Sequence, residues 1–241
     1  FEGWEPNPDG SFDMVFGYLN RNYEEHLNVS IGESNYFEPG EPDRGQPAFF
    51  YPRRHRFSFR VRVPADWGDK ELIWTVTANG RTDRAVGWLV PEQIIDDQVV
   101  AMNRSGGGAP DVKNDAPSIT LGEDTHRSVK VGDALVLTAV IHDDGIPEMR
   151  AARQSRPPGR RNALGLRLAW LHYRGVGEVI FDPWTRPMAD HTPGWEPPPV
   201  PDAGRTTTTA RFSQPGTYVI RGLADDGYLY SSADVTVTVT P

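Results

Sequence analysis

Cysteine is absent from this chain of 241 residues, and no long apolar run is present. Without cysteine there are no disulfides, no thiolate nucleophile and no Cys-ligated zinc site. The best apolar run, "ALVLTAVI", has the length of a buried strand and falls far short of the roughly 18–20 residues of a membrane helix. The sequence therefore predicts no membrane-spanning helix.

An excess of basic residues is also lacking. The formal net charge is −8; residues 1–100 carry 17 acidic and 10 basic side chains, and residues 101–241 carry 16 and 15. Binding to nucleic acid phosphates requires a dominant basic face. This charge balance excludes nucleic acid as the expected partner.

Catalytic signatures and helical periodicity are equally scarce. The sequence has no Gly-x-Ser-x-Gly elbow, no His-Glu-x-x-His pair, no phosphate loop and no dinucleotide fingerprint. One short segment, "PEQIIDDQVVAM", is the only candidate helix. We therefore expect a protein that is not an enzyme and has little helix.

Alternation of apolar and polar residues runs through the chain instead. In "RFSFRVRV" every second residue is apolar, and "ELIWTVTANG" repeats the pattern before an Asn79-Gly80 turn signal. Further strand-length segments, bounded by Gly, Pro or Asp, follow beyond residue 118. Short strands separated by turns predict an all-β fold of antiparallel sandwiches.

A stretch without periodicity divides the chain. "RSGGGAPDVKNDAP" consists mainly of Gly, Pro and charged residues, which is typical of a linker. We therefore expect two tandem immunoglobulin-like β-sandwiches, at residues 1–103 and 118–241, joined by a Gly/Pro linker at 104–117.

The second half carries a recognisable order of motifs, "AWLHYRGVGEVIF", a Thr-rich strand, "PGTY", "DDG" and a final Val/Thr strand. In this order it resembles the PKD-type, immunoglobulin-like repeats of bacterial surface proteins. The resemblance implies that Trp170 is the core tryptophan of the third strand. It also implies that Tyr218 forms a tyrosine corner, with its hydroxyl bonded to nearby backbone. The first half resembles a β-sandwich module of uncharacterised secreted bacterial proteins, which implies no function.

Two aspartate pairs are the candidate metal ligands. Asp225-Asp226-Gly227 and Asp143-Asp144-Gly145 both follow strands. Such triplets form turns, because Asp side chains bond local backbone and Gly adopts positive φ. The four carboxylates could also meet at one end of the sandwich and bind Ca²⁺. No other cofactor is expected.

Two insertions in the second sandwich are the candidate interface. The Arg-rich insertion (residues 143–163) and the Pro/Trp insertion (residues 182–204, with seven Pro) exceed the loops of the repeat family. Clustered Arg suits acidic protein surfaces or anionic headgroups, and Trp on a stiff loop suits an interface. Either insertion could instead be a solvated loop, or fold back over the sandwich. The interface candidates are Arg150, Arg153, Arg156, Arg160, Arg161, Trp184 and Trp195.

These features predict a non-catalytic structural or interaction subunit outside the cytoplasm, in the periplasm or secreted. Phe1 rather than Met stands first, which fits cleavage of a secretory signal and leaves a lipid anchor upstream open. Its partners would be proteins of a larger assembly, such as the periplasmic face of a membrane complex; a photosynthetic reaction-centre and antenna complex is one example.

Three alternatives remain. A glycan-binding module would use Trp67, Trp88, Trp184 or Trp195 as stacking platforms. A filament or surface-layer subunit would form head-to-tail contacts between identical chains. A hydrolase would need a cleft with convergent polar groups.

Overall fold

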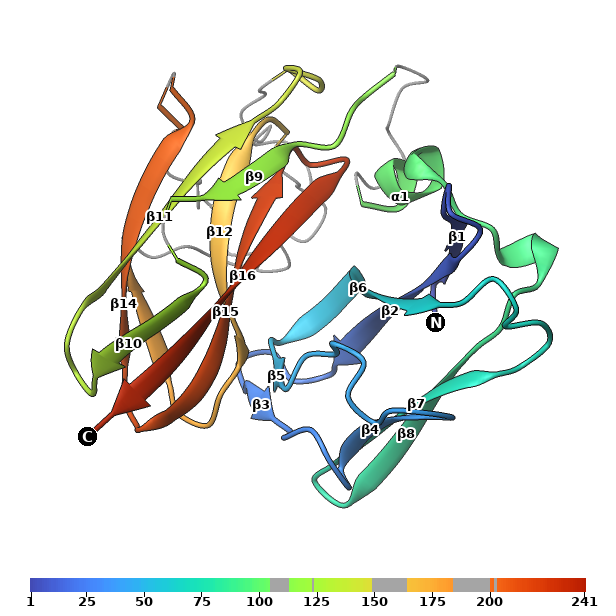
Figure 1. The fold of residues 1–241 in the computed structure, drawn as a ribbon, viewed down its shortest axis with the longest axis horizontal. Coiled ribbons are helices and arrows are strands. Elements are labelled where there is room, and N and C mark those ends of the chain that lie inside the picture. The colour runs from blue at the N-terminus through green and yellow to red at the C-terminus, as the bar shows by residue number, and fades with distance from the viewer. Residues whose placement is uncertain (105–112, 123, 149–163, 184–199, 202) are drawn as a thin grey trace. The chain divides into compact units, whose positions relative to one another are not determined.

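The computed structural model describes residues 1–104, 113–122, 124–148, 164–183, 200–201 and 203–241 (Figure 1). Contacts divide the chain into two units, Phe1–Val99 and Val100–Pro241. The boundary falls within helix α1 (Asp97–Arg104), which follows the 3₁₀ helix η1 (Pro91–Gln93). Both helices lie where the sequence predicted its only helix. Among the described helices, none has the length and apolar character needed to cross a membrane.

The N-terminal unit is a β-sandwich of two three-stranded sheets. One sheet has the order β1 (Gly3–Pro6), β2 (Phe12–Asn20), β6 (Arg53–Val63). The other has the order β4 (Asn35–Glu38), β7 (Leu72–Ala78), β8 (Arg81–Gly87). A short ribbon of β3 (Leu27–Asn28) and β5 (Phe49–Phe50) completes the unit. All of these pairs are antiparallel, as the sequence predicted.

Aromatic side chains from both sheets form the core of this sandwich. Phe16 of β2 stacks on Phe59 of β6 at 5.6 Å between ring centroids, and packs edge-on against Trp74 of β7 at 6.1 Å. The alternating residues of β6 point inward, as their spacing predicts; Phe57, Phe59, Val61 and Val63 are all buried. The opposite residues of β6 face solvent and form ion pairs, for example Arg60 with Glu5 at 2.7 Å. The period of two therefore assigned the two faces correctly.

The C-terminal unit is an immunoglobulin-like sandwich by its strand order. One sheet has the order β13 (Val179–Asp182), β14 (Arg205–Phe212), β11 (Leu135–His142), β9 (Ser118–Leu121). The other has the order β10 (His126–Lys130), β16 (Tyr230–Thr240), β15 (Gly216–Asp225), β12 (Arg167–Arg174). In immunoglobulin terms these are strands D-E-B-A and A′-G-F-C. The chain is thus all-β, with two tandem sandwiches.

One strand pair departs from the purely antiparallel arrangement that we predicted. Strand β10 runs parallel to β16, whereas β9, just before it, pairs antiparallel with β11. The first strand of this sandwich is therefore split between both sheets, and its second half meets the last strand in the same direction. A split of this kind leaves no periodicity signal, because each half alternates normally.

The two residues implied by the resemblance lie where it placed them. Trp170 is 1% exposed at the centre of the core. The Tyr218 hydroxyl accepts a hydrogen bond from the Gly177 amide at 3.1 Å and donates one to the Gln214 carbonyl at 2.8 Å. Gly175 allows the ring to lie this close, since a Cβ there would stand 2.1 Å from it. The tyrosine corner is confirmed.

Candidate interaction site at one end of the C-terminal sandwich

The described flanks of both insertions meet at one end of the C-terminal sandwich, which we call the insertion end. It comprises the C-terminal ends of β11, β13 and β15 and the N-terminal ends of β9, β12, β14 and β16. The Ile141 amide donates to the Gly204 carbonyl at 3.0 Å, and the Gly165 amide donates to the Asp226 carbonyl at 2.7 Å. The Arg-rich insertion joins β11 to β12, and the Pro/Trp insertion joins β13 to β14. Both therefore leave from, and return to, the same end.

All seven of the predicted interface residues lie outside the described residues. They are Arg150, Arg153, Arg156, Arg160, Arg161, Trp184 and Trp195. What the structure provides is the framework on which their segments begin and end. That framework includes Asp182 and Pro183 on one side, with Thr208 donating to the Pro183 carbonyl at 3.1 Å.

Asp226 closes the hairpin between β15 and β16 at the insertion end. One of its carboxylate oxygens, Oδ1, accepts the amides of Tyr228 at 2.5 Å and Leu229 at 2.7 Å. The other, Oδ2, accepts from the Asn114 side-chain amide at 3.0 Å. Burial raises the pKa of Asp226 above its usual range, against the lowering effect of these hydrogen bonds. This aspartate is a turn residue, and it also ties the start of the sandwich to the hairpin.

Asp225 has a different role, which sequence reasoning missed. It is 1% exposed, and Oδ1 accepts from Arg167 at 2.6 Å and from the Gly227 amide at 2.7 Å. Oδ2 forms an ion pair with Arg104 of α1, whose guanidinium also lies 4.5 Å from the Tyr230 ring centroid. Arg104, which we expected to begin the linker, is instead the last residue of α1 and is anchored here. No local pattern could reveal these pairs, because the partners are 58 and 121 residues from Asp225.

The second aspartate pair lies beside the first. Asp144 accepts the amides of Asp115 at 3.0 Å and Ile146 at 2.8 Å, and Asp143 Oδ2 accepts the Gly145 amide at 3.0 Å. Burial raises the pKa of Asp143 to about 6, and the neighbouring Asp226 charge adds to the rise. The structure thus brings the two pairs to one end, as expected, with each carboxylate bound to turn amides. Among the described residues, no group of three or more His, Asp or Glu side chains is arranged to hold a metal ion.

One candidate of the glycan-binding alternative is corrected by the structure. Trp67 is 7% exposed, and its indole N–H donates to the Lys70 carbonyl at 2.8 Å. Its ring packs in the core of the N-terminal unit and offers no open face to a sugar. The alternation of the neighbouring strand did not reveal this, because Trp67 lies in a turn between β6 and β7. Trp88 is partly exposed.

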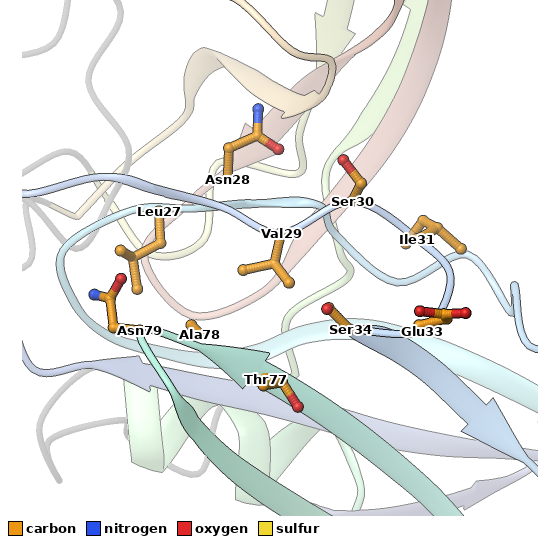
Figure 2. A pocket seen from close by; sticks show the side chains of 10 residues that line it. All are labelled: Leu27, Asn28, Val29, Ser30, Ile31, Glu33, Ser34, Thr77, Ala78 and Asn79. Carbon is orange, nitrogen blue, oxygen red and sulfur yellow. The ribbon is translucent and has the colours of Figure 1, made fainter.

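The N-terminal unit contains two adjoining hollows that the sequence did not predict. One, of about 450 Å³, lies between the segment around β3 and the end of β7 (Figure 2). The other, of about 570 Å³, lies between the end of β2 and the β7–β8 hairpin. They share four lining residues, Leu27, Val29, Ala78 and Asn79.

Comparisons with known proteins assign this chain to no family. No protein-family model matches the sequence, and no curated protein matches it. Three of the solved structures that align with it are domains 4 and 5 of the S-layer protein SbsC, the D00-D0 domain of Intimin and the Yersinia pseudotuberculosis adhesin InvE.

All three alignments are weak. They show 11%, 12% and 10% identity, respectively, and each has a TM-score of 0.28. They cover 96%, 94% and 98% of this chain, and 82%, 100% and 60% of the other chains. Similarities at this level carry no argument. The immunoglobulin-like assignment rests on the strand order and the tyrosine corner, and the PKD subtype stays a prediction.

Proposed function

We propose that this chain is a non-catalytic interaction subunit that acts outside the cytoplasm and docks onto a larger assembly. The observation that carries the proposal is that the described flanks of both insertions lie at the insertion end. In an immunoglobulin sandwich, loops at one end project from a rigid frame and supply a contact surface without altering the core. Here, buried bonds of Asp225 and Asp226 fix that frame.

Composition suggests the chemistry of the partner. The Arg-rich insertion has five Arg within residues 150–161 with no acidic residue among them, and its three acidic residues, Asp143, Asp144 and Glu148, all precede them. Arg forms bidentate bonds with carboxylates and phosphates, and Trp in the Pro/Trp insertion would supply apolar anchors. We therefore propose an acidic protein surface as the docking partner, on the periplasmic face of a membrane complex; a photosynthetic reaction-centre and antenna complex is one example.

The test is an affinity pull-down from the native membrane fraction with the full chain. One variant replaces residues 184–199 with a Gly/Ser segment of equal length, and a second changes the five Arg of the insertion to Ser. A control variant changes Arg54 and Arg56, both exposed on the N-terminal sandwich, to Ser. A stoichiometric complex should form with the full chain and the control and be lost with both insertion variants. Unchanged recovery with these variants would contradict the proposal, and recovery of the chain alone would favour self-assembly.

Calcium at the same end is a separate proposal. Two buried oxygens there, Asp143 Oδ1 and Asn114 Oδ1, accept no hydrogen bond from any described residue. Carboxylate and amide oxygens are ligands that Ca²⁺ takes. We expect 5 mM Ca²⁺ to raise the midpoint of thermal unfolding relative to EGTA, and to have no effect on Asp143→Asn. Equal midpoints of the unmodified chain in both buffers would refute calcium binding.

A further inference from the structure

The larger hollow of the N-terminal unit is a groove between one edge of each sheet. Its walls are the end of β2 with the following residues (Gly17–Asn22) and the β7–β8 hairpin. Its floor includes Phe50, Trp74, Val76 and Leu27, which are side chains of the sandwich interior. The volume of about 570 Å³ adjoins the hollow drawn in Figure 2 through Leu27 and Ala78. A groove of this kind exposes apolar surface that a filled sandwich would cover.

Strand β8 borders this groove with Arg81, Asp83, Arg84 and Ala85, and it has an unpaired backbone edge. It is the last strand of its sheet, in the order β4-β7-β8. Asn79 and Gly80 have φ of 50° and 74°, which defines a two-residue type I′ hairpin, so Ala78 and Arg81 form a hydrogen-bonded pair. By strand alternation, the backbone groups of Thr82, Arg84 and Val86 then point away from β7. Among the described residues no strand lies on this side of β8, and no backbone hydrogen bond outside the strand ladders involves these three.

The opposite wall is also an unpaired edge. Strand β1 pairs with β2 only from Phe12 to Val15, so no described strand lies beside Gly17–Asn20 on that side. Leu19, within this segment, is 53% exposed. The sandwich therefore has a strand-sized opening between two edges, above an apolar floor.

The groove rim has a charge opposite to that of its unit. Arg81 is paired with Asp83 at 3.0 Å, and both side chains are mostly exposed. Arg21 and Arg84, which also line the groove, form no ion pair with any described residue. Residues 1–100 have a net charge of −7. The rim of the groove is therefore basic, whereas the unit that contains it is acidic. Charged edge residues commonly protect a sheet from aggregation; that role alone does not require an apolar groove beside the edge.

We propose that this groove accepts an extended segment of a partner protein, which adds as a strand to the edge of β8. Apolar side chains at alternate positions would point toward Trp74 and Val76, and carboxylates would pair with Arg21 and Arg84. The outward-facing backbone groups of residues 82, 84 and 86 would pair with a segment of about five to seven residues, which is roughly 17–23 Å long. This surface lies on the N-terminal sandwich and is independent of the insertion end.

The test uses a random dodecapeptide library displayed on phage and selected on the full chain. Selected peptides should alternate apolar and acidic residues. When a selected peptide is bound, hydrogen exchange at the amides of Thr82, Arg84 and Val86 should slow at least tenfold. Arg84→Pro removes the amide that faces the groove edge, whereas Arg84→Ala keeps it and removes only the charge. Affinity should fall more than tenfold with Arg84→Pro and only a few-fold with Arg84→Ala.

Two results together support the addition of a partner strand to β8. The selected peptides slow exchange of the β8 amides, and Arg84→Pro loses more affinity than Arg84→Ala. The proposal is overturned if selection yields no saturable binder, if binders protect amides elsewhere, or if both variants bind equally well. An unfolding midpoint for each variant shows whether Arg84→Pro is folded. If it is not, the exchange measurement on the unmodified chain decides the outcome.

Discussion

Asp225 and Asp226 are neighbours in the chain, and their side chains lie in different environments. Asp226 bonds the amides of its own turn and Asn114, whereas Asp225 lies between the guanidiniums of Arg104 and Arg167. A buried ion pair costs desolvation, and its loss on one side leaves an uncompensated charge. The contribution of Asp225 should therefore be much larger than that of an aspartate at the surface.

A pair of substitutions tests this difference. Asp225→Asn should lower the free energy of unfolding by about 3–5 kcal/mol, because two buried guanidiniums lose their carboxylate. Asp234→Asn removes the bidentate partner of Arg221, at 2.7 and 2.8 Å, but Asp234 is 39% exposed. We expect a loss of about 1 kcal/mol or less there. Urea unfolding of both variants measures the two values; equal losses would show that the Asp225 pairs contribute no more than a surface pair.

The environment of Asp143 predicts a dependence on pH. Burial, with the charges of Asp226 and Asp144, raises its pKa to about 6 in the folded state. The folded protein therefore holds this proton more tightly than the unfolded chain, and the free energy of unfolding falls as the pH rises from about 4 to about 6. Asp143→Asn should thus stabilise the protein at pH 7, and by less at pH 4. Because the side chain is partly exposed, screening limits the gain to about 1 kcal/mol.

Urea unfolding at pH 4 and pH 7, without added Ca²⁺, measures this effect. Asp133→Asn serves as a matched exposed control with the same change of charge. An equal effect of Asp143→Asn at both pH values would contradict the assigned cause.

At the scale of elements, turn chemistry and strand order place the candidate surfaces. The Asn79-Gly80 hairpin sets which residues of β8 face its free edge. The immunoglobulin order brings the B–C and D–E connections, here the two insertions, to one end. The described flanks of the two insertions, distant in sequence, therefore lie at the same end of the sandwich.

Substitutions of Gly80 test whether the β7–β8 hairpin requires positive φ at this position. No atom lies within 4 Å of where its Cβ would be, so a substitution meets only the cost of positive φ. Gly80→Ala should lower the free energy of unfolding by about 1 kcal/mol. Gly80→Asn should cost less, because Asn tolerates left-handed backbone better than Ala. Thermal and urea unfolding compare the two; an Asn variant less stable than the Ala variant would argue against a type I′ turn.

At the scale of the whole molecule, each unit has its own hydrophobic core. The N-terminal core contains Phe16 and Trp74, and the C-terminal core contains Trp170 and Tyr218. Separate cores are the condition for independent folding. We therefore expect residues 1–104 and 113–241, produced separately, each to unfold in one cooperative transition.

Circular dichroism with urea and near-ultraviolet spectra provide the measurement. A fragment with strand content but no cooperative transition would show that it depends on the rest of the chain. A fragment that begins at residue 97 keeps Arg104 and its ion pair with Asp225, whereas one that begins at residue 113 loses it. We therefore expect residues 97–241 to have a larger free energy of unfolding than residues 113–241.

The sequence by itself determined the all-β class, the buried alternation of β6, the Asn79-Gly80 turn and the roles of Trp170 and Tyr218. The first three follow from a local period or local turn geometry within a short segment, and the roles of Trp170 and Tyr218 follow from the motif order that resembles the PKD-type repeats. Tertiary structure decided the parallel pairing of β10 with β16, the burial of Trp67, the Arg104–Asp225–Arg167 pairs and the groove beside β8. Each of these depends on segments brought together by sheet assembly, and a one-dimensional pattern does not specify which distant edges or charges will meet.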